Sequence, residues 1–196
     1  MFIRRSFNLN PVHTPMGLNI KLNFGDCYPM QASTDNHSKI TFNTVLHTGD
    51  LVPISIRISE EMHPLIPNAY NLAFGPIGHD DQIDDNIKLR HQNHSKLFST
   101  IISAGITFLG NNKEKFLGID GSDNAKAYMY YRCIQNNYDY LNQYLNIYGV
   151  KYYVRILREP NENNGSFLDS EDVVATSNLI HKEPFLKSYI TISFST

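Results

Sequence analysis

The chain has no tryptophan, only two cysteines and little net charge, and each shortage excludes something. Cys27 and Cys133 are too far apart for a metal motif and too few for a disulfide framework. A formal net charge of −2 provides no overall basic field for nucleic acid, so such binding would need a local patch. Cys133 lies in a predicted helix among apolar residues, and we interpret it as a buried structural thiol.

Long apolar runs and export signals are also missing. No window approaches the roughly eighteen uninterrupted apolar residues that a membrane-spanning helix needs. Arg4 and Arg5 near the amino terminus are not followed by an apolar stretch, so these residues do not resemble a signal peptide. We therefore expect a cytoplasmic protein with no membrane partner, and two free thiols fit that compartment.

The chain does contain enough apolar material for one domain. Its 196 residues are 41% hydrophobic and 12% aromatic, which suits a single domain with a sizeable core. Tyr and Phe supply all of this aromatic content. Because a buried Tyr hydroxyl needs a partner or water, we expect the core to have a polar boundary.

Apolar periodicity predicts strands early in the chain and helices later. Alternation predicts early strands over residues 17–24, 40–46, 51–58 and 87–90, and a further short strand over 71–76 is stopped by Gly-Pro. A turn at 47–50 joins the second and third strands into an antiparallel hairpin. Ser95 is expected to cap a helix over 96–109 that is apolar around much of its circumference and therefore lies buried on the sheet.

A short strand over 116–119, a Tyr-rich helix over 122–146 and a strand over 150–157 follow. This order predicts an α+β fold, with a mainly antiparallel sheet and two principal helices packed on one face. We expect residues 1–160 to form a single domain. Residues 161–196 would form a linker, at 161–165, and a C-terminal extension that adds an edge strand at 189–194.

The strand–turn–helix around Gly121-Ser122 is the first candidate for chemistry. A helix that begins at Ser122 would present free N–H groups and a partial positive charge, which can hold an anion. Lys126, one turn further on, would add a full charge. An ordinary strand-to-helix connection with a good cap explains the same residues, and both interpretations stay open.

Tyrosines and cations extend this candidate site. From Lys113 to Arg158 the chain has seven basic and four acidic residues, so this part is mildly basic within an acidic protein. Exposed Tyr and Arg side chains can stack on bases or bind phosphate, but tyrosines also fill a wet core boundary. The candidate ligand-binding residues are Gly121, Ser122, Lys126, Tyr130, Arg132 and Arg155.

Acidic and histidine residues give weaker candidates. The loop 79–85 has four carboxylates that can bind a hard cation, but their spacing differs from an EF-hand and a solvated loop is the simpler interpretation. Asp84 and Asp85 are thus weak metal candidates. His91 and His94 flank a predicted junction without a known zinc spacing. We expect no metal and no other cofactor.

Several motifs together carry a family resemblance that runs from about residue 70 to 158. They are Tyr70-Asn71-Leu72-Ala73-Phe74-Gly75, Asp84-Asp85, the helix around 97–109, and Gly121-Ser122 with Ala125-Lys126 and the Tyr- and Arg-containing helix. In these motifs the chain resembles a family of uncharacterised small proteins from Bacteroides-type bacteria. The resemblance implies Arg where this chain has Lys126, and Lys keeps the charge but lacks the planar fork.

The family has no established activity, and its members resemble accessory or toxin–antitoxin-like proteins. The resemblance therefore implies a nucleic-acid or protein target. We favour binding of a phosphate-bearing ligand, RNA or a nucleotide, at Gly121–Arg132 in a bacterial defence or toxin–antitoxin setting. The alternatives are a non-catalytic interaction module, which binds a protein partner or a second copy through 161–196, and a metal-dependent nuclease that uses Asp84 and Asp85. No motif names a reaction.

Overall fold

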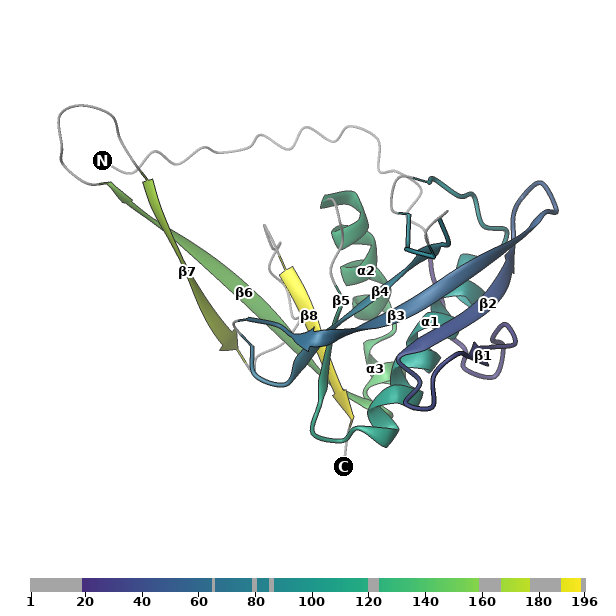
Figure 1. Cartoon of the computed structure of the whole chain (residues 1–196), viewed down its shortest axis with the longest axis horizontal. Coiled ribbons are helices and arrows are strands. Elements are labelled where there is room, and N and C mark those ends of the chain that lie inside the picture. The colour runs from purple at the N-terminus through teal and green to yellow at the C-terminus, as the bar shows by residue number, and fades with distance from the viewer. Residues whose placement is uncertain are drawn as a thin grey trace.

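The computed structural model describes residues 19–64, 66–78, 81–84, 87–119, 124–158, 167–176 and 188–194, with only the backbone described at Asn124 and from residue 149 onward. They form one sheet with helices on one side (Figure 1). The strands are β1 (Gln31–Ala32), β2 (Lys39–Val45), β3 (Leu51–Met62), β4 (Ala69–Pro76), β5 (Phe116–Ile119), β6 (Leu145–Arg158), β7 (Phe167–Thr176) and β8 (Ser188–Phe194). The helices are α1 (His94–Asn111), α2 (Asn124–Asn136) and α3 (Tyr138–Leu141).

The sheet runs in the order β1-β2-β3-β4-β5-β8-β6-β7. Its neighbours pair antiparallel, except that β4 and β5 are parallel and α1 forms the crossover between them. Figure 1 shows α1 and α2 on the same side of the sheet, and β6 and β7 extend away from the helices as a two-stranded ribbon. The predicted α+β class, with a mainly antiparallel sheet and two principal helices on one face, is confirmed.

The predicted hairpin is confirmed as β2 and β3, and its register divides the sheet into two faces. Ile40 pairs with Ile56, and these side chains are buried against the helices. Lys39 and Arg57, the next pair, therefore lie on the opposite face, because neighbouring residues of a strand point to opposite sides. We call the face away from the helices the outer face.

The strand predicted at 17–24 is wrong for the residues described, which pair with no strand of the sheet. This segment continues to Tyr28 along α1 and α3, and we call residues 19–28 the N-terminal strap. Its alternation is real, because Ile20 and Leu22 are buried in the core while Lys21 and Asn23 are exposed. Side chains accept its backbone N–H groups in place of a neighbouring strand.

The long helix predicted over 122–146 is shorter in the structure. Asn137 leaves helical geometry, at φ −117° and ψ 18°, and separates α2 from the single turn α3. The chain then enters β6 at Leu145, whose side chain is buried together with that of Ile147. This alternation of buried side chains belongs to β6, so the helical pattern ends earlier than we expected.

Two smaller expectations are also wrong. The side chain of Asn93, rather than Ser95, caps α1 by accepting a hydrogen bond from the Lys96 N–H at 2.9 Å. Residues 87–90 form no strand, and near them an isolated bridge joins Leu46 and His91.

The expected edge strand lies inside the sheet. β8 pairs with β5 on one side and with β6 on the other, and the two ends of the sheet order are β1 and β7. The linker expected at 161–165 lies outside the described residues, and the domain boundary at residue 160 stays a prediction. Within the part of the chain that the structure describes, no helix combines the length and apolar character needed to cross a membrane.

Candidate functional site

The predicted anion site lies where β5 leads into α2. β5 ends at Ile119 and α2 begins at Asn124, and the two residues Gly121 and Ser122 lie outside the described residues. The first turn of α2 contains no acidic residue, and Asp123, directly before it in the sequence, lies outside the described residues. Lys126 lies in this turn and is half-buried.

The parallel pair of strands gives this junction its setting. β4 and β5 run side by side in the same direction, with Tyr70 opposite Leu117. Their carboxyl ends therefore point to the same side of the fold, one followed by the loop 77–84 and the other by α2. In sheets with parallel strands, ligands bind outside these carboxyl ends, often against a helix N-terminus.

Tyr130 belongs to the core boundary. Its ring centroid lies 5.5 Å from that of Phe74 on β4 and 5.9 Å from that of Phe98 on α1. Lys126 is one turn before Tyr130 and shares its side of α2. This packing explains the ring of Tyr130 without a stacked base.

Arg132 lies on a different side of α2 from Lys126, about 120° around the axis at 3.6 residues per turn. Its side chain is exposed and donates a hydrogen bond from Nη1 to Gln135 Oε1 at 2.9 Å. Tyr128, which is 63% exposed, lies on this same side. The predicted residues thus form two groups on α2. Arg155 lies in the part of β6 for which only the backbone is described.

The acidic loop after β4 folds back onto the outer face. The Gly78 N–H donates to the Gln82 carbonyl at 2.7 Å, and the Asp84 N–H donates to the Pro76 carbonyl at 3.0 Å. A Cβ atom at Gly75 would lie 2.6 Å from Ile83 Cγ2, so only glycine lets the loop lie this close to β4. The loop is therefore packed against the sheet rather than freely solvated.

Asp81 fastens this loop to two cations, and we call the contact the Asp81 latch. Its Oδ2 lies 2.6 Å from Lys39 Nζ and 3.0 Å from Arg57 Nη2. The hydrogen bond from Lys39, with the charges of both cations, holds the pKa of the Asp81 carboxyl below its usual value. The sequence did not reveal this latch, because Lys39 and Arg57 meet only through the register of the hairpin.

Asp84 belongs to no cluster of metal-ligating side chains among the residues described. Asp84 is half-buried, and Asp85 lies outside the described residues. In the described part of the chain, no three His, Cys, Asp or Glu side chains lie close enough together to hold a metal ion.

His91 and His94 do meet, with ring centroids 6.0 Å apart. His91 Nδ1 lies 3.2 Å from Thr44 Oγ1, and burial is the main cause that lowers the pKa of both imidazoles. The charge of each ring's histidine neighbour, His94 for His91 and His47 for His94, lowers the pKa further.

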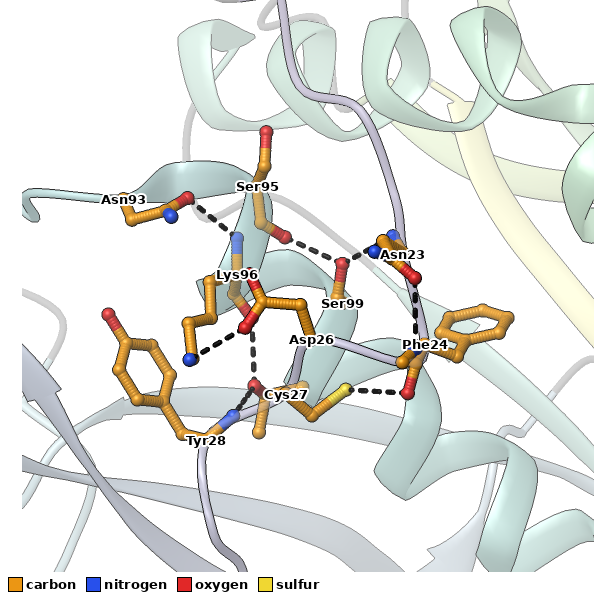
Figure 2. Close-up of polar contacts among 11 residues, drawn as sticks. Asn23, Phe24, Asp26, Cys27, Tyr28, Asn93, Ser95, Lys96 and Ser99 are labelled. Atoms are coloured by element: carbon orange, nitrogen blue, oxygen red, sulfur yellow. Dashed lines mark hydrogen bonds and ion pairs between the residues drawn. The ribbon is translucent and has the colours of Figure 1, made fainter.

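A second polar cluster, which the sequence did not indicate, joins the N-terminal strap to α1 (Figure 2). Lys96 Nζ lies 2.7 Å from Asp26 Oδ1 and 5.1 Å from the centroid of the Tyr28 ring. The hydrogen bond to Asp26 raises the pKa of Lys96. Ser99 Oγ accepts the Asn23 N–H at 2.9 Å, as Figure 2 shows.

The thiol in this cluster is not activated. Cys27 Sγ lies 3.6 Å from the Phe24 carbonyl oxygen, and burial raises the pKa of the thiol. Since the thiolate is the reactive form, Cys27 lacks the character of a nucleophile. All polar groups of the cluster that we describe are used to hold the strap, so its role is structural.

Over the residues described, the fold and these contacts define an α+β domain with a mixed sheet, in which the parallel pair β4–β5 leads into α2. The chain belongs to DUF6934, a family of unknown function, whose model matches residues 24–171. Neither the curated proteins nor the solved structures include a match to this chain. The expected membership of an uncharacterised family is thus confirmed, and the matched range includes the Asp81 latch and α2 but ends before β8.

Proposed function

We propose that the protein binds a phosphate-bearing ligand, a nucleotide or RNA, where β5 leads into α2. The observation that supports this most is the first turn of α2, which follows the carboxyl end of a parallel strand and contains Lys126 but no acidic residue. Backbone N–H groups at the turn and the ammonium group of Lys126 would hold the phosphate. The predicted residue Gly121 has no side chain and would let the backbone approach the phosphate closely, and the hydroxyl of Ser122 would donate to it.

The two sides of α2 separate the possible ligands. A mononucleotide is expected to contact mainly the side of α2 that carries Lys126, because Arg132 lies six residues further on and about 120° away around the helix. A longer RNA chain can pass around the helix and also contact Arg132 and the exposed ring of Tyr128. Arg155 would then extend the RNA path along β6. The setting in bacterial defence or toxin–antitoxin biology comes from the resemblance alone and belongs to the hypothesis.

The first prediction separates these ligands by substitution. We expect Lys126→Gln to weaken binding of both ATP and a short single-stranded RNA by about tenfold or more, the scale of a hydrogen bond to a charged group. Arg132→Gln is expected to weaken RNA binding only. Lys113→Gln removes an exposed cation just after α1 and serves as the matched control. Fluorescence anisotropy with labelled ligands measures all four proteins.

Equal affinity of the wild type and Lys126→Gln for both ligands would contradict the site. If only Arg132→Gln loses RNA binding, the site lies instead on the side of α2 that carries Arg132 and Tyr128. If the wild type binds neither ligand, the second candidate function below gains weight.

The second candidate is a non-catalytic interaction module that recruits a strand at β7. β7 stands at the end of the described sheet order and has ten residues, enough for a partner strand to pair. The partner is a protein or a second copy of this chain. This replaces the strand 189–194 in that role, because β8 is enclosed between β5 and β6.

Adjacent residues test this second candidate, since their N–H groups point to opposite sides of a strand. We would compare Val173→Pro with Val174→Pro by analytical ultracentrifugation. Self-association that is lost in one variant and kept in the other, with both still folded, supports pairing at β7. A wild-type protein that stays monomeric at high concentration excludes a second copy as the partner.

A further inference from the structure

Lys39 and Arg57 form a basic pair that needs an anion. They stand directly opposite each other on β2 and β3, on the outer face of the sheet. Like charges at such a cross-strand position destabilise a sheet unless an anion lies between them. Both side chains are only partly exposed, with 30% and 24% of their surface accessible, which limits screening by water.

The anion now present is a side chain of the same protein. Asp81 contacts both cations through one oxygen, Oδ2, and adopts a left-handed backbone conformation at φ +57°. Asp tolerates this conformation better than most residues, but it remains uncommon. The carboxylate keeps 61% of its surface exposed, and an ion pair with so exposed a partner is weak.

Asp81 leaves the guanidinium of Arg57 incompletely used. Arg57 Nε donates to Ser55 Oγ at 3.4 Å, and Ser55 itself is fully buried under the loop. The terminal guanidinium nitrogen Nη2 of Arg57 is also buried and makes no hydrogen bond, although it lies 3.0 Å from Asp81 Oδ2. The contact between these two groups is therefore one of charge without an aligned hydrogen bond, and a buried donor without an acceptor is costly.

We propose that Lys39 and Arg57 form a binding site for a phosphate group, in which the Asp81 carboxylate is an internal substitute that the ligand displaces. A phosphate has several acceptor oxygens and up to two charges, so it can accept from both nitrogens of the Arg57 fork and from Lys39 together. It would thereby give the buried Nη2 of Arg57 the hydrogen bond that Asp81 does not provide. This site lies on the opposite face of the sheet from α2 and does not depend on the function proposed there.

Inorganic phosphate is the probe for this site, and the side-chain Nε–H resonance of Arg57 in an NMR titration is the readout. We expect Asp81→Asn to bind phosphate about two- to fivefold more tightly than the wild type, because the internal competitor loses its charge while an exposed ion pair contributes little. Asp50→Asn is the matched control, since it removes a carboxylate at the far end of the same hairpin. Arg57→Lys keeps the charge without the fork and is followed through the backbone amide resonance of residue 57, because it lacks the guanidinium. It is expected to bind more weakly than the wild type.

A latch that is only structural gives a different result. In that case Asp81→Asn changes the melting temperature but binds phosphate no better than Asp50→Asn, and the proposal is overturned. Equal phosphate affinity of the wild type and Arg57→Lys also overturns it. Lys126→Gln is expected to leave the Arg57 resonance and its phosphate response unchanged, so this site and the one at α2 succeed or fail separately.

Discussion

Asn137 shows how much one polar residue can do within a core. Its side chain is 9% exposed, accepts the Leu22 N–H at 2.9 Å, and donates to the carbonyls of Ile20 and Cys133 at 2.8 and 2.7 Å. It therefore ends α2 and holds the N-terminal strap at the same time. The sequence does not distinguish it from its neighbour Asn136, since both lie in the same polar part of the helix.

Replacing this residue tests its role. We expect Asn137→Ala to lower the free energy of unfolding by about 2–4 kcal/mol, because it leaves buried backbone groups of the strap without partners. Asn136→Ala, at an exposed position of the same helix, is the control and should change stability by less than about 0.5 kcal/mol. Urea denaturation followed by circular dichroism measures both, and equal effects would contradict this account.

The histidine pair makes stability depend on pH. Burial lowers the pKa of His91 and of His94, so the folded protein binds fewer protons than the unfolded chain below their ordinary pKa of 6.5. The two histidines should therefore leave the free energy of unfolding unchanged above about pH 7. They should reduce it as the pH drops toward their lowered pKa values. The slope is at most about 1.4 kcal/mol per pH unit for each histidine, and less here because both rings keep contact with water.

Denaturation midpoints at several pH values measure this slope. The double substitution of His91 and His94 by Gln should flatten it between pH 5 and 7. His63→Gln, in the connection between β3 and β4, is the control. An unchanged slope in the double variant would mean that carboxylates rather than these imidazoles cause the dependence.

The site residues could be predicted only where local pattern decides. Periodicity placed Lys126 and Tyr130 one turn apart on one side of a helix, and that is where they lie. It did not reveal that Phe74 and Phe98 would occupy the ring of Tyr130, because those contacts come from two other elements. The Lys39–Arg57 pair escaped notice for the same reason, since only the register brings it to Asp81.

At the scale of elements, the predictions succeeded where apolar period and length agreed. The β2–β3 hairpin, β4, α1 and β5 all follow such patterns and lie within a few residues of the predicted bounds. The N-terminal strap has the same alternation as a strand, because any extended chain buries every second side chain. Whether strands or helix side chains accept its N–H groups depends on distant residues, which the pattern does not contain.

The capping of α1 offers a prediction for that element. Asn93→Ala should destabilise the protein by about 1 kcal/mol, the usual contribution of an N-cap side chain. Ser95→Ala is the comparison, because Ser95 Oγ accepts the Lys21 N–H of the strap instead of capping the helix. We expect only the serine variant to increase amide hydrogen exchange in the strap, and the opposite pattern would contradict the assigned cap.

At the scale of the whole molecule, β8 connects two parts of the sheet. It pairs over Leu117–Ile119 on β5 and over Leu145–Lys151 on β6. We expect a chain that ends before Ser188 to lose most of its stability, which is about 5–15 kcal/mol for a typical domain. Removal of Ser195 and Thr196 alone is the control. Cooperative thermal unfolding of the shorter chain at the wild-type temperature would show that β8 is dispensable.

The position of β8 also sets an order of events during synthesis. The strands β1 to β5 and the ribbon β6–β7 leave the ribosome before the strand that joins them, so the sheet closes through its most distant contacts in sequence. Until then, the edges of β5 and β6 present unpaired backbone groups, which invite pairing with other nascent chains. A chaperone that binds exposed strand edges would therefore act on this protein before β8 has been synthesised and added to the sheet.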